Sequence, residues 1–141
     1  MKANEICNCN IIRNGSSKLT AIYDQALLSS GIKVTQYGLL KYIYLLKSPS
    51  LKQLGSSLYQ DRSTLGRNIR ILERMKLVTL NSGKDKREVK ITLTKDGIVS
   101  LRKARKAWKC IQKTIIFKLG KEKQEQLIEI MNDIQSIDLK L

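Results

Sequence analysis

Three cysteines are the residues of this chain with thiol chemistry, and the chain contains no histidine. Cys7 and Cys9 form a Cys-x-Cys pair near the N-terminus, and Cys110 lies far along the chain. A structural zinc site needs four ligands. No second ligand pair accompanies the Cys-x-Cys pair, so we expect no metal and no cofactor. Because histidine, a glycine-rich phosphate loop and a Gly-x-Ser-x-Gly turn are all missing, the sequence also argues against an enzyme.

Basic side chains dominate the charge, since 27 Lys and Arg outnumber 12 Asp and Glu for a formal net charge of +15. Such a polycation predicts a polyanionic partner, nucleic acid ahead of an acidic membrane surface. No apolar run approaches the roughly 18 residues that span a bilayer, and the N-terminus has no apolar signal core. We therefore expect a cytoplasmic protein, in which an odd number of thiols stays reduced.

Apolar residues recur at three- and four-residue steps through the first part of the chain, which predicts helices. The first predicted helix starts at Ile6 and ends near Gly31. The second begins at an N-cap on Thr35, is apolar on most sides and ends before Pro49. A short third helix covers about residues 51–58. The 141 residues, 42% of them hydrophobic, are enough for one domain with a core.

A fourth helix is predicted to open at Asp61 or Arg62 and to end near Met75. Its two faces differ sharply in chemistry. The inward stripe is apolar, and the outward stripe is basic and hydroxylated. The inward residues are Leu65, Ile69 and Leu72, and the outward residues are Ser63, Arg67, Arg70 and Arg74.

The sequence period then changes from that of a helix to that of a strand. Residues 77–80 predict a short strand, and the alternation of Val89, Ile91 and Leu93 with polar residues predicts a second, half-exposed strand. The two would form a hairpin. Thr94 is a predicted N-cap for a long helix to about Leu119, with Ile98, Leu101, Trp108, Ile111 and Ile115 inward. A last helix is expected over about residues 121–137, packed through Leu127, Met131 and Ile134.

Two short helices followed by a basic-faced helix and a hairpin describe a helix-turn-helix with a wing. An α-helix fits the major groove of DNA, and flanking Lys and Arg meet the phosphates. The plainer alternative is that the arginines form a solvated face. Gly66 either lets the helix lie close to the groove wall or weakens the helix. On the DNA-binding interpretation Ser63, Thr64 and Arg67 read bases, and Arg62, Arg70, Lys84 and Lys86 meet phosphates.

The expected hairpin tip carries Lys84, Asp85, Lys86 and Arg87. The negative potential of the minor groove favours a guanidinium, so we expect Arg87 to enter it. Asp85 is expected to position the wing by holding Arg87, or a nearby arginine of the preceding helix, in a bidentate pair. The alternative for Asp85 is a turn residue that accepts backbone hydrogen bonds.

The order of these segments resembles the MarR family of bacterial transcription regulators. The resemblance is carried by Thr35-Gln36-Tyr37, QLGSSLYQDRSTLGRNIRILERMKLV and DKREVKITLTKDG, and the Asp-x-Arg of the wing followed by Leu-Thr-x-x-Gly is its most specific part. It implies a dimeric winged-helix repressor, less often an activator, on a palindromic operator, released by a small ligand or an oxidant. Apolar stripes on the terminal helices need a partner surface, which a dimer provides. We expect a single domain, 1–141, with dimerisation helices at 5–30 and 95–141 and a winged-helix region at 33–94.

The resemblance extends to the organic-hydroperoxide-sensing branch of that family, which carries a reactive cysteine early in its first helix with tyrosines around it. Placing Tyr23 on one of those tyrosines puts Cys9 on the reactive cysteine. The other two tyrosine positions fall on Arg13 and Val34, so the chain departs from the branch's peroxide pocket. The plainer interpretation of Cys9, on the apolar side of its helix, is a small buried hydrophobe.

Three kinds of regulation remain open from the sequence. Arg13, one helical turn from Cys9, favours a reactive thiolate, with Cys110 of another subunit or Cys7 as resolving thiol. Small-ligand sensing is the second kind, and a regulator without a signal is the third. The ligand cleft would be lined by first- and second-helix residues, namely Arg13, Tyr23, Tyr37 and Tyr44, each of which is individually more often core or interface.

The predicted long helix carries many cations and no acid between Gly97 and Lys121. A basic amphipathic helix can lie on an anionic membrane. Its apolar residues repeat like a packing seam, however, so we favour an extended electrostatic footprint for DNA and expect no membrane binding. Two competing functions are a thiol-based redox protein that uses Cys9 and a non-specific architectural protein that shows no preference among duplexes.

Overall fold

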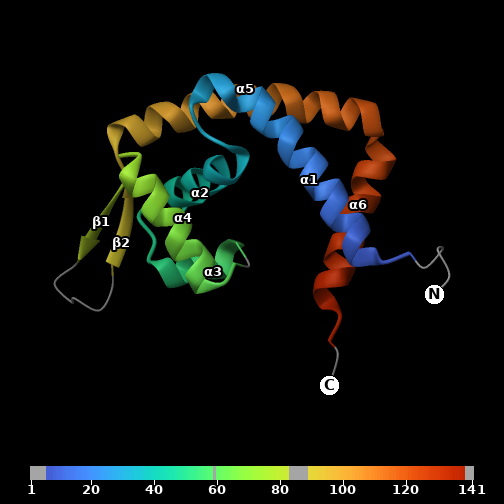
Figure 1. Ribbon diagram of the computed structural model, residues 1–141, viewed down its shortest axis with the longest axis horizontal. Coiled ribbons are helices and arrows are strands. Elements are labelled where there is room, and N and C mark those ends of the chain that lie inside the picture. The colour runs from blue at the N-terminus through green and yellow to red at the C-terminus, as the bar shows by residue number, and fades with distance from the viewer. Residues whose placement is uncertain (1–5, 59, 83–88, 139–141) are drawn as a thin grey trace.

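The chain folds into six α-helices and a two-stranded antiparallel hairpin, as a computed structural model describes for residues 6–58, 60–82 and 89–138 (Figure 1). The expected fold class, mainly α with a hairpin wing, is confirmed. In chain order the elements are α1 (Asn8–Leu27), a 3-10 turn η1 (Leu28–Ser30), α2 (Val34–Leu45), α3 (Leu51–Leu58), α4 (Arg62–Arg74), β1 (Val78–Ser82), β2 (Val89–Leu93), α5 (Lys95–Leu119) and α6 (Lys121–Ser136).

The start of α2 differs from the sequence expectation, because Thr35 lies inside the helix and Lys33 is its N-cap residue. Two side chains satisfy the free N–H groups at this end. Asp24 of α1 accepts a hydrogen bond from the Val34 N–H (2.7 Å), and Gln36 accepts one from the Lys33 N–H (2.8 Å). A hydroxyl cap at Thr35 is therefore unnecessary, since a carboxylate from another helix takes its place.

The core of the winged region lies where α2, α3, α4 and the hairpin meet. Leu40, Leu54, Leu65 and Leu72 are fully buried there. The hairpin pairs Val78 with Leu93 through to Ser82 with Val89, and the Ile91 N–H donates to the Pro49 carbonyl (2.9 Å). The segment ahead of α3 thus adds an isolated one-residue bridge, Ser50 to Lys90, to the edge of the hairpin.

The expected inward alternation of β2 holds at its centre and fails at its outer end. Ile91 is 1% exposed, whereas Val89 is 39% exposed. Val89 pairs with Ser82 at the end of the ladder away from α5, where the strands extend past the helical core. Alternation in the sequence therefore marks which face a residue takes, but not whether another element reaches that face.

The base of the hairpin is fixed to the first turn of α5. Thr94 caps this helix as expected, because its hydroxyl oxygen accepts from the Gly97 N–H (3.0 Å) and its O–H donates to the Lys76 carbonyl (2.7 Å). Gly97 lies directly on the backbone of Leu77. A Cβ built on Gly97 would stand 2.0 Å from the Leu77 carbonyl oxygen.

The long helix α5 joins the winged region to a second part of the molecule, in which α1 packs on α5 and α6 turns away from its far end (Figure 1). No residue of α6 within the described chain is buried, and large apolar side chains of α1, α5 and α6 face solvent. Ile111 and Ile115, which the sequence places inward, are only half-buried. Among the described residues, no helix is long and apolar enough to cross a membrane.

Candidate nucleic-acid interface

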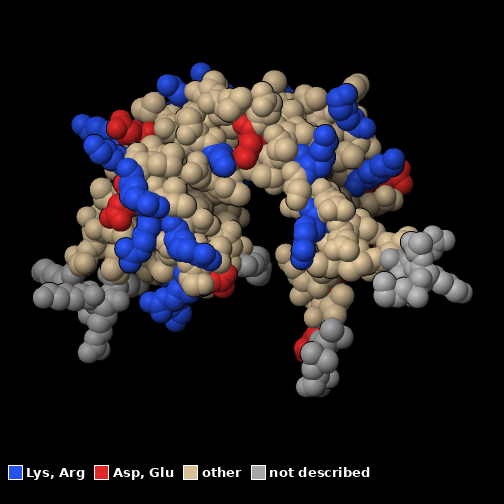
Figure 2. Space-filling view, viewed as in Figure 1, with Lys and Arg blue, Asp and Glu red and all other residues tan. Residues whose placement is uncertain are grey.

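The outward face of α4 is basic because its inward face is fixed by burial. Leu65, Ile69 and Leu72 are at most 2% exposed. At 3.6 residues per turn this turns Arg67, Arg70 and Arg74 to the opposite side, and all three are exposed. Figure 2 shows Lys and Arg side chains gathered over α4 on this face of the molecule. The predicted inward and outward stripes of this helix are confirmed.

Asp61 caps the first turn of α4. Its Oδ1 accepts hydrogen bonds from the Ser63 hydroxyl (2.7 Å) and from the Thr64 N–H (2.9 Å). Hydrogen bonds from Ser63 and Thr64 hold the pKa of the Asp61 carboxyl well below its usual range, which favours its ionised form. The sequence named Asp61 only as an opening of the helix, although an Asp three residues ahead of the bonded N–H is a capping signal.

Residues beside α4 extend the polar surface. Arg62 lines a groove of about 440 Å³ together with Lys52, Ser56 and Gln60. Arg67, Arg70 and Arg74 line a second hollow together with Ile71 and Glu73. Ser63 is exposed and Thr64 is half-buried. The structure therefore brings the predicted residues Arg62, Ser63, Thr64, Arg67 and Arg70 onto one helix, with Lys52 as a neighbour that the sequence did not single out.

The predicted wing residues Lys84, Asp85, Lys86 and Arg87 lie outside the described residues. The strands that flank them, β1 and β2, pair in antiparallel register. The hairpin itself is thus confirmed, whereas the minor-groove role of Arg87 and the positioning role of Asp85 stay predictions.

Replacing Gly66 by alanine should stabilise the protein by about 0.5–1 kcal/mol, because glycine inside a helix costs about that much relative to alanine. The nearest atom to a Cβ at Gly66 is Leu51 Cδ2 at 4.0 Å, so the methyl group fits without strain. The same contact turns this position toward α3 and away from the arginine face. Urea unfolding measures the gain in stability. Unchanged DNA affinity would show that Gly66 only weakens the helix and is not needed for a close approach to the groove wall. Lower affinity in Gly66→Ala would favour the close approach instead.

The three thiols are free and exposed in the single chain. Interpreting Cys9 as a small buried hydrophobe is therefore wrong for the isolated chain, because none of the described residues covers its side chain enough to bury it. A guanidinium nitrogen of Arg13, Nη2, donates to Cys9 Sγ at 3.7 Å, as the helical spacing predicts. This contact places the guanidinium of Arg13 directly beside the thiol.

Tyr23 lies at the other end of α1 from Cys9. Its hydroxyl donates to the side-chain oxygen of Gln112 on α5, and burial raises its pKa. Fourteen helical residues separate the two, which is about 21 Å at 1.5 Å per residue. A single chain therefore does not bring Cys9 and Tyr23 together.

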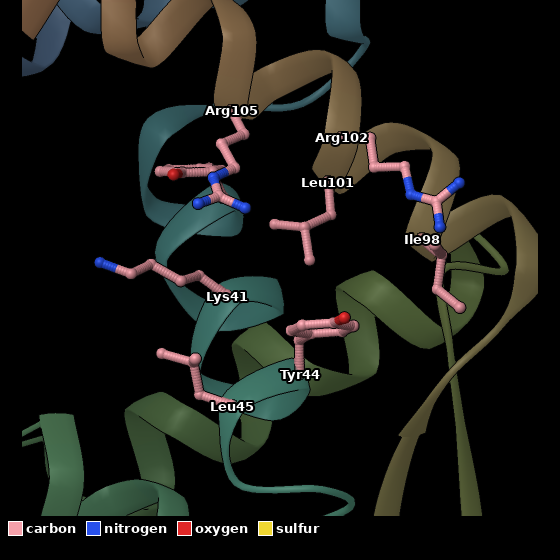
Figure 3. A pocket seen from close by; sticks show the side chains of 8 residues that line it. Lys41, Tyr44, Leu45, Ile98, Leu101, Arg102 and Arg105 are labelled. Carbon is pink, nitrogen blue, oxygen red and sulfur yellow. The ribbon is translucent and has the colours of Figure 1, made fainter.

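A cavity of about 190 Å³ lies between α2 and α5 (Figure 3). Tyr37 and Tyr44 line it as the sequence predicted, but Arg13 and Tyr23 are not among its lining residues. The expected cleft between the first and second helices is thus corrected to one between α2 and α5. The correction follows from packing, since α5 and not α1 covers this face of α2. The other lining residues are Lys41, Leu45, Ile98, Leu101, Arg102 and Arg105.

The cavity combines aromatic and apolar walls with three cations. Leu101 of α5 projects toward α2 (Figure 3), Lys41, Arg102 and Arg105 are the lining cations, and none of the described lining residues is acidic. Burial raises the pKa of Tyr37, and the positive charge of Arg105 opposes that rise. The Tyr37 ring also lies 5.8 Å from the ring of Trp108, and Lys41 Nζ lies 5.8 Å from the same indole. Such a site suits a small anion with a flat apolar body.

Comparison with known proteins gives a consistent result. No protein-family model matches the chain. The organic hydroperoxide resistance transcriptional regulator of Bacillus subtilis is 31% identical over 97 residues, which are 68% of this chain and 66%, just under two thirds, of that protein. The M. tuberculosis transcriptional regulator MosR in complex with DNA is 28% identical, with a TM-score of 0.83 over 95% of this chain and 100% of that chain. MarR from E. coli is 18% identical with a TM-score of 0.66, covering 92% of this chain and 96% of that one, which shows likeness of fold alone.

Proposed function

This chain belongs to the MarR family of winged-helix transcriptional regulators, and on that premise we propose that it is a homodimeric repressor of a palindromic operator in double-stranded DNA. The proposal includes release from the operator by a small ligand or an oxidant. The family membership expected from the sequence is confirmed by the relative and the structures to which the chain is similar.

The observation that carries the proposal is the exposed basic face of α4. Arg67, Arg70 and Arg74 stand on one side of a helix whose opposite side is in the core, next to a hairpin. A helix so anchored can enter the major groove, where arginine pairs with guanine and neighbouring cations neutralise phosphates. MosR, the relative with a similar fold and 28% identity, has a structure in complex with DNA.

Selection of the reduced protein on a pool of random duplexes at near-physiological salt tests this function. We expect enrichment of an inverted repeat, because a two-fold symmetric dimer presents two identical α4 helices. Enrichment of a single site without an inverted repeat would contradict the palindromic operator. Equal binding of all duplexes would favour the architectural alternative.

The homodimer is supported by the apolar surface of the second part of the molecule. We call the exposed residues Ile11, Phe117, Ile128 and Ile130 of α1, α5 and α6 the dimer surface; Phe117 is 87% exposed. Large apolar side chains exposed in this number mark an interface between proteins. With α6 unburied in the single chain, a second copy would supply its core.

Phe117→Glu should convert the dimer to a monomer, since a carboxylate buried in an apolar interface is strongly unfavourable. Sedimentation should give twice the 16.1 kDa chain mass for the wild-type protein and a single chain mass for the variant. Val99→Glu, at an exposed apolar residue of α5 in the winged half, is the control and should stay dimeric. A dimeric Phe117→Glu protein would place the interface elsewhere.

The cavity between α2 and α5 supports an anionic effector. We expect benzoate to quench or shift the fluorescence of Trp108, the one tryptophan of the chain, because Trp108 packs on Tyr37 in the cavity wall. Arg105→Ala should weaken this binding about tenfold or more, since a charge-assisted hydrogen bond contributes about 1.5–3 kcal/mol. Lys103→Ala, an exposed cation outside the cavity lining, is the control. Equal binding of neutral benzamide would contradict an anion site.

Cys9 supports an oxidant as the alternative signal. Its thiolate would attack an organic hydroperoxide, giving a sulfenic acid and releasing the alcohol. We expect cumene hydroperoxide to reduce operator affinity of the wild-type protein and of Cys110→Ala, and to leave Cys9→Ser bound. The reaction should stop after one equivalent, whereas a peroxide-consuming enzyme would turn over without DNA. Loss of binding by Cys9→Ser on oxidation would exclude Cys9 as the sensor.

A further inference from the structure

The start of α4 carries an acidic group next to a face that is mostly basic. Asp61 is exposed and ionised, and both Ser63 and Thr64 are hydrogen-bonded to it. A bare helix N-terminus attracts phosphate through its free N–H groups. Here the Asp61 carboxylate already accepts from the Thr64 N–H and its charge repels a phosphate, so we expect the partner of this carboxylate to be a group other than a phosphate.

The bond between Asp61 and Ser63 fixes what the serine can offer. A serine hydroxyl has one hydrogen and two lone pairs. Because that hydrogen is donated to Asp61 Oδ1 (2.7 Å), Ser63 Oγ presents only lone pairs to a partner. The bond is charge-assisted, which makes it stronger than a bond between neutral groups. The Asp61–Ser63 pair therefore accepts hydrogen bonds from a partner and does not donate them, whereas Arg62 between them lines the groove beside Lys52.

We propose that Asp61 and Ser63 are specificity-determining residues that select a base with an exocyclic amino group at the operator position facing the start of α4. In the major groove, adenine N6 and cytosine N4 are the donors, whereas guanine and thymine present acceptors that both residues would oppose. Arg67 lies one turn further on the same face and offers only donors, which suit guanine O6 and N7. Each half-site should thus hold adenine or cytosine close to a guanine. This inference rests on the proposed DNA-binding function.

Asp61→Asn is a matched variant, because asparagine caps a helix as well as aspartate does and its oxygen keeps the bond from the Thr64 N–H. Its amide nitrogen, however, is a donor and its charge is zero. In selection on random duplexes we expect the wild-type protein to enrich adenine or cytosine at one position of each half-site. Asp61→Asn should lower that preference about 5- to 100-fold and admit guanine or thymine. Ser63→Ala should weaken the preference without reversing it.

An operator with one altered base tests the same contact at atomic level. Replacing the selected adenine by purine, which lacks N6, or the selected cytosine by pyrimidin-2-one, which lacks N4, should weaken wild-type binding about 5- to 100-fold. Asp61→Asn should be far less sensitive to the replacement. Circular dichroism and urea unfolding check that both variants keep the wild-type fold.

Three outcomes would overturn the inference. If both variants keep the wild-type base preference, Asp61 is a helix cap alone. If Asp61→Asn binds every sequence more tightly by the same factor, its charge merely opposes nearby phosphates. If the wild-type protein enriches no sequence, the proposed function fails and the inference fails with it. If the wild-type protein enriches a sequence and the variants enrich the same one, the inference alone fails.

Discussion

Gly97→Ala should destabilise the protein by about 3 kcal/mol or more, the upper range for overpacking a core. The added Cβ would stand 2.0 Å from the Leu77 carbonyl oxygen and 3.0 Å from its carbonyl carbon. Neither atom belongs to a side chain that can turn away. Relief requires moving α5 off the hairpin, which also breaks the bonds from the Thr94 O–H to Lys76 and from the Thr94 N–H to Leu77. Urea unfolding at neutral pH measures the loss.

The control for this prediction is Gly66→Ala, whose nearest contact is 4.0 Å away and whose expected effect has the opposite sign. A general intolerance of alanine at helical glycines would destabilise both variants. Gly97→Ala with wild-type stability would show that the first turn of α5 is not held against Leu77. Because this contact joins the winged region to α5, a shifted variant should also lose operator affinity, beyond its loss of stability.

Local signals in the sequence predicted the elements that local interactions determine. The bounds of α3, the inward leucines of α4 and the Thr94 cap all match the structure, because each depends on residues within one or two turns. The Leu-Thr-x-x-Gly start of α5 also has a physical cause. Thr94 satisfies the free N–H groups, and only glycine at position 97 allows the backbone of Leu77 to approach.

Features that depend on packing between distant elements were missed or misplaced. Thr35 is not the cap of α2, because Asp24 reaches its N-terminus from α1. The cavity is built by α2 and α5, so Lys41 and Arg105 line the same site although they are far apart in the sequence and no periodic pattern connects them. The sequence signal for this site is that Lys41 lies one helical turn after Tyr37, and Arg105 one turn after Leu101. This spacing identifies a shared cavity only when α2 is known to pack on α5.

Arg67→Ala should weaken operator binding by about 1–3 kcal/mol and relax the base preference at one position of each half-site. The reason is geometric: Arg67 lies on the face opposite Leu65 and Leu72, where it is exposed, and nearly two turns beyond the Asp61 cap. A bidentate pair with guanine at that depth carries sequence information. Selection on random duplexes, followed by titration of the wild-type operator and single-base variants, measures both effects.

Arg70→Ala separates base reading from phosphate contact on the same helix. Arg70 is also exposed but lies three residues further from the N-terminus, where we expect it to meet the backbone. Its loss should weaken all duplexes by the same factor and lower the salt slope by about one unit, with base preference unchanged. If Arg70→Ala altered the base preference and Arg67→Ala did not, the C-terminal half of α4 would be the part that lies deeper in the major groove. The two arginines would then exchange roles, and Asp61 would lie too far from the bases to select them.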